Sequence, residues 1–528
     1  MIRRPLLTLA TAAAIAFATR SARAETPADT LIEAQAIDGV ISFDPAEIFE
    51  FLAGEVSNNI YLRLITLEEE DTTKLVGGAA ESWTVSDDGL TLTFTMRPDL
   101  KFASGAPVTA KDAAFSLQRV VKLNLSPAFI LTLLGWSTEN VDQMVVAKDD
   151  ATLELKIAEP LAPTLVLNAL SAGVGAVVEE SVVMANEKDG DLGHEWLSRN
   201  SAGAGAFVLR DWRPNEVIVL EANKNFYKGA PTLERIIIRH VPEAATQRLM
   251  LEKGDIDIAR NLGSDQLEAL SSNPDVKIDI QPKANVLYLG MNTTLDVLAD
   301  AKVREAIRWL VDYQGIADAL LQRQYIAHQS VLGSGGFAAL DDLPYSFDPE
   351  KAKALLAEAG QSDLKLTLDV FAASPFRDIA ETLQANFAQA GVELEIVAAD
   401  RKQTLTKYRA RNHQLVMMYW SPDYGDPHST IDFFVNNPDN TDQSTLKTIA
   451  WRNGWASAET QKLMKDAMLE GDPAKREEMY ARIQRTLQHE SPVAVMFQQT
   501  DAVAMRANVN GWISGPSFDT YVFRNITK

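Results

Sequence analysis

The stretch AESWTVSDDGLTLTFTMRPDLKFASGAPVTAKD, residues 80 to 112, carries the clearest fold information in this sequence. Asp87-Asp88-Gly89 separates two runs of alternating polar and apolar residues, and an Asp-Gly pair in that position predicts a β-hairpin. Thr109 and Asp112 have the spacing of a capping box, which predicts that a helix begins there. We therefore expect residues 80–112 to form two paired strands followed closely by the start of a helix.

The same alternation of short strands and amphipathic helices continues outward from this stretch, which predicts an α/β protein. Aspartate followed by proline at 348–349 and at 472–473 marks two helix starts, and Gly254, Gly360 and Gly391 mark helix ends. Strands are predicted at 216–221, 235–240, 255–258, 286–291, 364–370 and 392–397, and helices at 244–253, 301–311, 349–359, 377–390 and from 473 onward.

Length and composition narrow the class of protein. The chain has 528 residues with 46% hydrophobic and 23% charged side chains, enough for about three globular domains. The net charge of -22 repels phosphate backbones, so nucleic acid is not an expected partner. With no Cys, thiolate catalysis, disulfides, Cys-ligated metals and lipidation at a cysteine are all excluded.

The N-terminus has the composition of a secretory signal peptide. Arg3 and Arg4 precede an uncharged stretch at 5–19, and Ala22-Arg23-Ala24 places small residues at the two positions that a signal peptidase recognises. The apolar part is shorter than the roughly 20 residues of a membrane span, and a buried helix is the alternative. We expect residues 1–24 to be removed, leaving an exported protein that is not a lipoprotein.

Motifs of enzyme chemistry are missing from the sequence. Its six histidines show no metal-ligand spacing, and neither a Gly-x-Ser-x-Gly elbow nor a phosphate-binding loop is present. No pair among the 72 acidic residues stands out as a glycosidase pair. We expect no cofactor and no metal, and we expect that the chain is not an enzyme.

One segment, Met417 to Pro427 (MMYWSPDYGDP), gathers aromatic and polarizable side chains beside two carboxylates. This composition is typical of a pocket for a cationic group. A strand that ends in an acidic surface turn is the alternative interpretation.

In order and spacing, the stretch 80–112 resembles the signature region of the periplasmic solute-binding proteins of ABC importers, in the dipeptide/oligopeptide-binding class (solute-binding protein family 5). The similarity continues through nearly the whole chain after residue 24. Further matching fragments are Gly205-Ala-Phe207, 223–229, 253–257, Asn292, 303–306 and 351–360. Phe43, where the family usually has Leu, and the loop 201–205 depart from the family pattern, and these departures bear on the ligand more than on the fold.

The resemblance implies a two-lobed α/β fold of the periplasmic-binding-protein type, class II, with a hinge and an extra third domain. Lobe one would combine 25–61, 201–282 and 491–528, the extra domain would be 62–200, and lobe two would be 283–490. The strand and helix pattern itself restarts near residue 283. Ligand would be enclosed between the lobes by hinge closure.

The resemblance also implies the ligand-binding residues. In the peptide binders of this family an aspartate after a Trp on the second lobe binds the ligand's ammonium group, and Trp420-Ser-Pro-Asp423 is similar to that motif. Asp423 is therefore the expected partner, with Trp420 and Tyr419 as walls, while Asp426 is expected to be a turn residue. For the ligand's carboxylate we expect Arg377, at the place where dipeptide binders carry an Arg; a one-residue shift would put Asp378 there instead.

The sequence thus predicts the periplasmic component of an ABC importer that captures short peptides and delivers them to permease subunits with their ATPases. We expect a monomer without stable membrane insertion. The first alternative keeps the fold and carries an opine, an oligosaccharide, haem or a nickel chelate. The second is an exported hydrolase, which would show turnover of its substrate.

Overall fold

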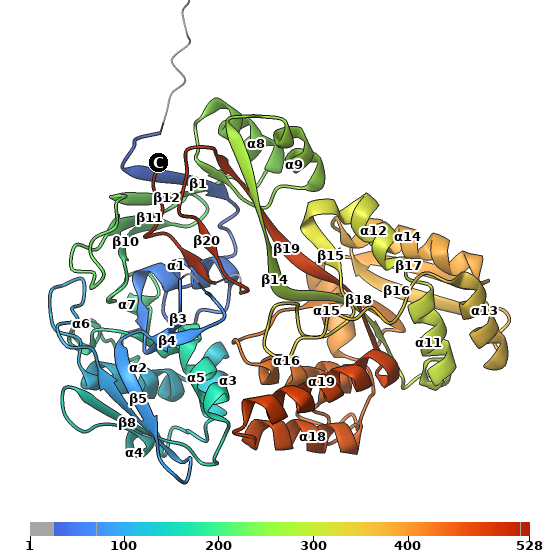
Figure 1. The fold of residues 1–528 in the computed structure, drawn as a ribbon, viewed down its shortest axis with the longest axis horizontal. Coiled ribbons are helices and arrows are strands. Elements are labelled where there is room, and N and C mark those ends of the chain that lie inside the picture. The colour runs from blue at the N-terminus through green and yellow to red at the C-terminus, as the bar shows by residue number, and fades with distance from the viewer. Residues whose placement is uncertain (1–25, 70, 518) are drawn as a thin grey trace, which may run out of the picture.

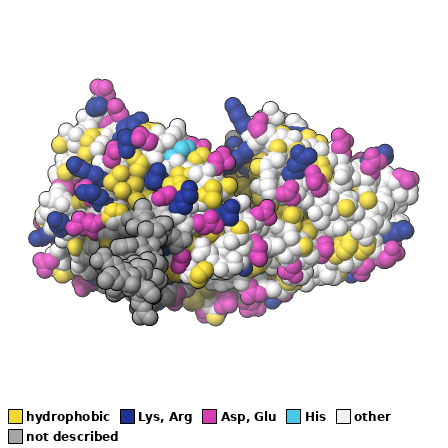
Figure 2. Space-filling model, turned by 90° about the horizontal axis from the view of Figure 1, so that it is seen from above, with side chains coloured by type: hydrophobic (Ala, Val, Ile, Leu, Met, Phe, Trp, Pro, Cys, Tyr) yellow, Lys and Arg dark blue, Asp and Glu magenta, His cyan; other side chains and the backbone are white. Residues whose placement is uncertain are grey.

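The computed structural model describes residues 26–69, 71–517 and 519–528, so the predicted signal peptide lies outside the described residues. Two halves stand side by side, joined by the long antiparallel strands β14 (Val276–Met291) and β19 (Val493–Arg506) (Figure 1). Seen from above, the surface dips between the halves, and acidic side chains are scattered over both (Figure 2). The predicted α/β architecture with two lobes is confirmed.

One large sheet runs through both halves. Its strand order is β10-β11-β12-β1-β13-β19-β14-β18-β16-β17, and β15 pairs with β19 off this path. The first half is parallel across β12, β1 and β13, whereas the second is parallel across β18, β16 and β17. The two crossing strands lie between these parallel blocks, and their pairing is interrupted between Pro282 and Val286.

The elements have the following bounds. The strands are β1 (Thr30–Gln35), β2 (Leu62–Arg63), β3 (Ile65–Leu67), β4 (Leu75–Gly77), β5 (Ala80–Val85), β6 (Thr91–Met96), β7 (Val145–Ala147), β8 (Thr152–Lys156), β9 (Ala176–Val177), β10 (Phe207–Arg213), β11 (Val217–Ala222), β12 (Arg235–His240), β13 (Ile258–Ala259), β15 (Tyr325–Ala327), β16 (Lys365–Phe371), β17 (Glu393–Ala399), β18 (Leu415–Trp420), β20 (Ile513–Ser514) and β21 (Tyr521–Val522), besides β14 and β19. The helices are α1 (Phe51–Ile60), α2 (Ala110–Leu123), α3 (Phe129–Thr132), α4 (Val141–Met144), α5 (Pro163–Ser171), α6 (Glu180–Ala185), α7 (His194–Leu197), α8 (Ala244–Lys253), α9 (Ser264–Ser271), α10 (Asp296–Ala299), α11 (Ala301–Trp309), α12 (Tyr313–Ile316), α13 (Pro349–Glu358), α14 (Phe376–Gln389), α15 (Arg401–Arg409), α16 (Pro427–Val435), α17 (Ile449–Arg452), α18 (Ala458–Leu469) and α19 (Pro473–Glu490). None of these helices is both long and apolar enough to cross a membrane.

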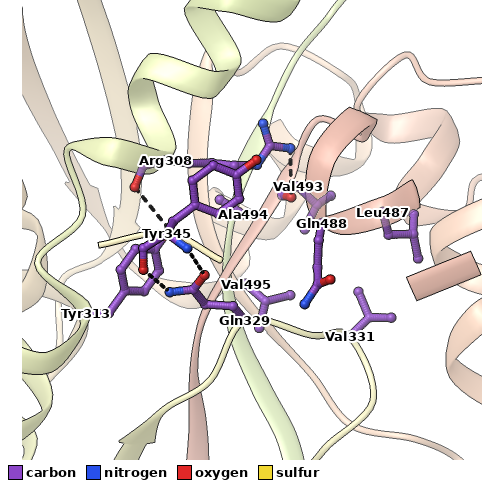
Figure 3. Close-up of a pocket in the computed structure, with 10 residues that line it drawn as sticks. All are labelled: Arg308, Tyr313, Gln329, Val331, Tyr345, Leu487, Gln488, Val493, Ala494 and Val495. Atoms are coloured by element: carbon purple, nitrogen blue, oxygen red, sulfur yellow. Dashed lines mark hydrogen bonds between the residues drawn. The ribbon is translucent and has the colours of Figure 1, made fainter. Parts of the chain in front are cut away.

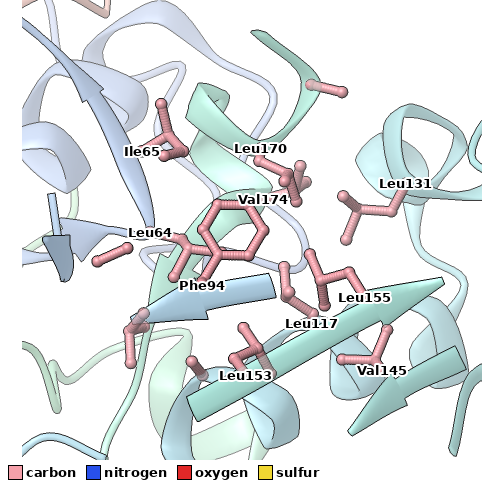
Figure 4. Close-up of a cluster of buried hydrophobic side chains, with 14 of the residues drawn as sticks. Leu64, Ile65, Phe94, Leu117, Leu131, Val145, Leu153, Leu155, Leu170 and Val174 are labelled. Atoms are coloured by element: carbon pink, nitrogen blue, oxygen red, sulfur yellow. The ribbon is translucent and has the colours of Figure 1, made fainter. Parts of the chain in front are cut away.

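The hairpin predicted around Asp87-Asp88-Gly89 is confirmed as β5 and β6, which belong to a separate sheet of order β5-β6-β8-β7. The predicted capping box is also confirmed, because Thr109 and Asp112 bond each other's backbone N–H at the start of α2. Phe94 of β6 is buried between this sheet and its helices (Figure 4). The signature stretch thus folds as one compact unit.

Several predicted helix limits match the structure closely. The helix predicted at 244–253 is α8 (Ala244–Lys253), and Gly254 ends it with a positive φ of 84°. Asp348 caps α13 by accepting a hydrogen bond from Lys351 N–H. In α14 the side chains spaced by four along one face are all buried: Ile379, Leu383 and Phe387.

Two predicted strands differ from the structure. The strand predicted at 255–258 is wrong over its first part, since only Ile258–Ala259 pair as β13. Asp257 is buried before it, and its carboxylate accepts hydrogen bonds from Ile32 N–H and Lys528 Nζ rather than facing solvent from a strand. The strand predicted at 286–291 begins ten residues earlier, at Val276, because it pairs with β19 in both halves.

Buried apolar side chains form separate clusters in the two halves. One cluster lies almost entirely within 46–204 and a second gathers side chains of α1, β10–β12 and the C-terminal residues, while two more fill the other half around β16–β18 and α19. The predicted domain boundaries stay a prediction. The cluster of 46–204 includes one side chain from the other half, Tyr424.

Candidate functional site

The candidate site lies where β18 ends and the chain continues toward α16. Leu415 to Met418 are buried because β18 is an inner strand, flanked by β14 on one side and β16 on the other. Tyr419 and Trp420 at its carboxyl end are half-buried. In parallel sheets, ligands bind at the carboxyl ends of the strands, at points where the strand order changes direction.

Trp420 and Tyr419 are both held in place by neighbours in the same half. Trp420 Nε1 donates a hydrogen bond of 3.0 Å to Thr430 Oγ1, and the indole packs 4.3 Å from the Phe433 ring. The hydroxyl of Tyr419 accepts a hydrogen bond from Arg401, whose guanidinium lies 5.6 Å from the Tyr419 ring centre. Two aromatic side chains with fixed orientations therefore lie at the end of β18, and their role as walls of a ligand site stays a prediction.

Asp423 follows three residues after Trp420. Its backbone N–H donates a 2.7 Å hydrogen bond to Ser429 Oγ, which fixes the turn. Within the described part of the chain, no hydrogen bond or ion pair to its carboxylate is present, and burial alone raises the pKa of that carboxyl to about 7. The site thus contains an acidic group without a cationic partner.

Asp426, in the same loop, has the opposite surroundings. Its carboxylate caps α16 by accepting from His428 N–H, and both oxygens accept 2.7 Å bonds from Arg476 of α19. Both side chains are only 1% exposed. Asp426 is a turn and capping residue, as expected from the proline that follows it.

The loop between β18 and α16 also touches the other half of the molecule. Tyr424 is buried in the hydrophobic cluster of 46–204, and a Cβ at Gly425 would lie only 2.8 Å from Asn168 Oδ1. Close by, Ala162 N–H donates to Met468 O at 2.7 Å and Arg476 Nη1 donates to Thr164 Oγ1 at 3.0 Å. Asp423 therefore lies at the junction between the halves.

Arg377, the residue expected to bind a carboxylate, is exposed in the first turn of α14. Its Nε donates a 3.0 Å hydrogen bond to Glu381 one turn later, and 59% of its side chain is accessible to solvent. Phe376 beside it packs 6.3 Å from the Tyr419 ring, so Arg377 is near the aromatic wall but already paired. Its role stays a prediction.

Sequence reasoning missed a buried charge cluster at the crossing strands. Arg260 forms ion pairs with Glu33 and Glu55 at 3.1 and 3.2 Å, and Tyr521 donates a hydrogen bond to Asp501 of β19. Lys283 of β14, in the interruption of the ladder, donates to Ser514 Oγ and Gly515 O. Burial lowers the pKa of Lys283 to about 8. No local motif indicates this cluster, because its members come from six separate segments.

Two hollows lie away from Asp423. One is inside the second half, where Arg308, Gln329, Tyr345 and Gln488 line it and much of the polar surface is bonded internally (Figure 3). The other lies in the first half, where Glu69 bonds Lys228 and Arg524. Neither includes a predicted site residue.

The described residues contain no group of three or more His, Asp or Glu side chains that could bind a metal ion. Three histidines are buried with lowered pKa values because burial disfavours their charged form: His328, His413 and His428.

Comparison with known proteins finds a family and relatives along nearly the full length. Residues 74–442 match the model of the bacterial extracellular solute-binding proteins, family 5 middle region. A probable D,D-dipeptide-binding periplasmic protein of Escherichia coli is 27% identical, covering 94% of both chains. The dipeptide-binding protein of the same organism is 26% identical, covering 89% of both. Heme-binding protein A of Haemophilus influenzae is 26% identical, covering 90% of this chain and 88% of its own.

A similar fold is found in solved structures. The ABC transporter-associated periplasmic binding protein DppA from Helicobacter pylori, in complex with the peptide STSA, superposes with a TM-score of 0.75 at 22% identity. The match covers 94% of this chain and 98% of that one. The two-lobed fold predicted from the sequence is therefore confirmed.

Proposed function

This chain belongs to the bacterial extracellular solute-binding proteins of family 5, and from this premise we propose that it binds short peptides for an ABC importer. The observation that carries the proposal is the carboxylate of Asp423, which lies at the junction of the halves with no partner among the described side chains. A peptide's α-ammonium group supplies the missing cation.

The physical reason lies in the cost of an unpaired charge. An ionised carboxylate shielded from water is unfavourable, which is why the pKa of Asp423 is raised to about 7. An ammonium group within hydrogen-bond distance favours the ionised form and forms a charge-assisted hydrogen bond. Trp420 and Tyr419 would cover the bound ligand from the second half.

The proposal includes the domain division and the closing motion. We propose lobe one at 25–61, 201–282 and 491–528, the extra domain at 62–200 and lobe two at 283–490. The motion would bend β14 and β19 where their pairing is interrupted. The contacts of Tyr424, Met468 and Arg476 with the other half, which are present in this structure, would be those made on closure.

Location and partners follow from the family. The relatives named above include a probable dipeptide-binding periplasmic protein and an ABC transporter-associated periplasmic binding protein, and we propose that this chain is exported to the periplasm after removal of residues 1–24. Its partners would be permease subunits and their ATPases. It would act as a monomer, by binding and not by catalysis.

Calorimetry tests the role of Asp423 with four combinations: wild type and Asp423→Asn, each with a peptide and with its N-acetylated form. Removing one partner of an enclosed charge pair costs about 2–5 kcal/mol, so Asp423→Asn should weaken the free peptide at least about thirtyfold. Acetylation should weaken binding to the wild type and change little further in the variant. Losses that simply add would show that Asp423 does not contact the amine.

A non-peptide cargo is the second candidate, because a heme-binding protein is about as similar as the dipeptide-binding one. Native mass spectrometry of the protein as purified distinguishes them by the mass of any retained ligand. A retained mass matching haem or a nickel chelate would contradict the peptide proposal.

A further inference from the structure

Three functional side chains follow three neighbouring parallel strands of the second half. The strands β18, β16 and β17 end at Trp420, Phe371 and Ala399, and β16 is parallel to both of its neighbours. Helices α16, α14 and α15 begin shortly after these ends. Asp423, Arg377 and Arg401 therefore lie on one edge of the sheet, the edge at which ligands bind in such folds.

Arg401 is the first residue of α15 and is exposed. Its side chain reaches from the end of β17 across the end of β16 to Tyr419 on β18, and its Nη2 donates a hydrogen bond to the Tyr419 hydroxyl. Among the described residues, no acidic side chain forms an ion pair with it. Arg401 is thus held in place by a hydroxyl group and not by a carboxylate.

The acidic groups nearest along the chain are occupied elsewhere. Asp400 caps α15 by accepting from Gln403 N–H at 2.9 Å, and Asp378 accepts from Ser374 Oγ. Arg377 differs from Arg401 because it is paired with Glu381. Of these three side chains, Asp423 and Arg401 thus have no charged partner among the described residues, whereas Arg377 has one. Tyr419, which bonds Arg401, and Trp420 end the strand that precedes Asp423.

We infer that Arg401, positioned by Tyr419, binds an anionic group of the ligand, so that the site selects molecules with an ammonium group at one end and a carboxylate at the other. The inference rests on the proposed function and names a residue other than Arg377 for the carboxylate. Guanidinium is suited to this role because it binds both oxygens of a carboxylate. The carboxylate is either the peptide's C-terminus or an acidic side chain.

The test uses native mass spectrometry of the full mature protein with a mixture of di-, tri- and tetrapeptides, offered as free acids and as C-terminal amides. Wild type should prefer the free acids at least about tenfold. Arg401→Gln should lower that preference to about twofold or less, and Arg401→Lys should restore part of it. Tyr419→Phe should reduce the preference without changing binding of the amides, because it removes only the hydroxyl that positions Arg401.

Arg409→Gln is the matched control, because it removes an exposed arginine at the other end of α15, and it should behave as wild type. Arg377→Gln tests the other arginine expected to bind the carboxylate, which is already paired with Glu381. Amides that carry Asp or Glu and bind wild type but not Arg401→Gln would assign the contact to an acidic side chain, which also supports the inference. Unchanged acid preference in Arg401→Gln, or its loss in Arg377→Gln alone, would overturn it. If wild type binds no peptide of either form, the proposed function itself fails, an outcome distinct from peptide binding that ignores Arg401.

Discussion

Asp423 and Asp426 stand three residues apart in one loop, yet they meet opposite surroundings. The carboxylate of Asp426 is bonded by Arg476 through both oxygens and caps α16. The carboxylate of Asp423 lacks such a partner among the described residues, and burial raises its pKa to about 7. The carboxylate of Asp426 is fully bonded within the fold, whereas that of Asp423 has no such partner there and, in the function proposed above, would bind the ligand.

The difference shows how a binding protein separates stability from recognition. A buried pair such as Asp426 with Arg476 adds little net stability over an apolar pair, but breaking it is costly. An unpaired carboxylate lowers the stability of the empty protein, and a cationic ligand removes that penalty. Breaking the pair of Asp426 and Arg476 should therefore lower mainly the free energy of unfolding, whereas a substitution of Asp423 should lower mainly the affinity for a ligand.

The largest expected effect is on folding, from Arg476→Met. This change leaves the buried carboxylate of Asp426 without its cation, and the free energy of unfolding should fall by about 3–5 kcal/mol. Urea denaturation measures it. Arg377→Met, which breaks only an exposed pair with Glu381, should cost no more than about 0.5 kcal/mol. Equal losses in the two variants would contradict the contrast drawn between the aspartates.

The next effect is on the pH dependence of binding. The ligand's ammonium needs the ionised form of Asp423, so with a pKa of about 7 affinity should fall about tenfold per pH unit below 7, to about a hundredfold at pH 5. Above about pH 8 the ligand's amine loses its proton and affinity should fall again. Calorimetry between pH 5 and 8.5 should show an optimum of affinity for wild type. For Asp423→Asn the affinity should not change between pH 5 and 7. If the affinity of wild type also stayed constant between pH 5 and 7, Asp423 would not be the residue that binds the ligand's ammonium group.

A smaller effect concerns the stability of the empty protein. The folded pKa of Asp423 is raised above the unfolded value of 3.8, so the native state binds the proton more tightly. Stability from this group is present below about pH 4 and is lost as pH rises through 7. Asp423→Asn should therefore raise the free energy of unfolding by about 1–3 kcal/mol at pH 8 and by almost nothing at pH 4. If Asp423→Asn were less stable than wild type at pH 8, the ionised carboxylate would have to be stabilised by other groups of the folded protein.

The two aspartates also show what sequence reasoning could and could not provide. The capping role of Asp426 was predictable because its signal, a proline in the next position, is local. Its partner Arg476 lies fifty residues away on another helix, and no spacing indicates it. Asp423 was predicted from a resemblance to a motif, but its isolation from other charges is a property of packing that only coordinates reveal.

The same limit applies to the fold and to Arg401. Helix ends with glycine signals, such as Gly254, were predicted closely because capping is local. Strand β14 was predicted ten residues too short because its first part is stabilised by pairing with β19, more than 200 residues later. Arg401 has no motif, and its contact with Tyr419 crosses a strand. The only sequence signal is that Arg401 comes four residues after the strand predicted at 392–397.

The smallest predicted effect examines whether the pair of Asp426 and Arg476 also joins the halves. Thr164→Val removes the hydroxyl that accepts a 3.0 Å hydrogen bond from Arg476 across the junction, while the bonds of Arg476 to Asp426 remain. One such bond contributes about 1 kcal/mol, so ligand affinity should fall about fivefold with no change in the melting temperature of the empty protein. Calorimetry and small-angle scattering with saturating peptide measure the affinity and the extent of closure. Thr486→Val is the matched control, because that exposed hydroxyl bonds only Arg482 O within α19. If Thr164→Val binds the ligand as tightly as the control, the hydrogen bond of Arg476 to Thr164 does not contribute to closure. Closure would then depend on the contact of Tyr424 and on the ligand instead.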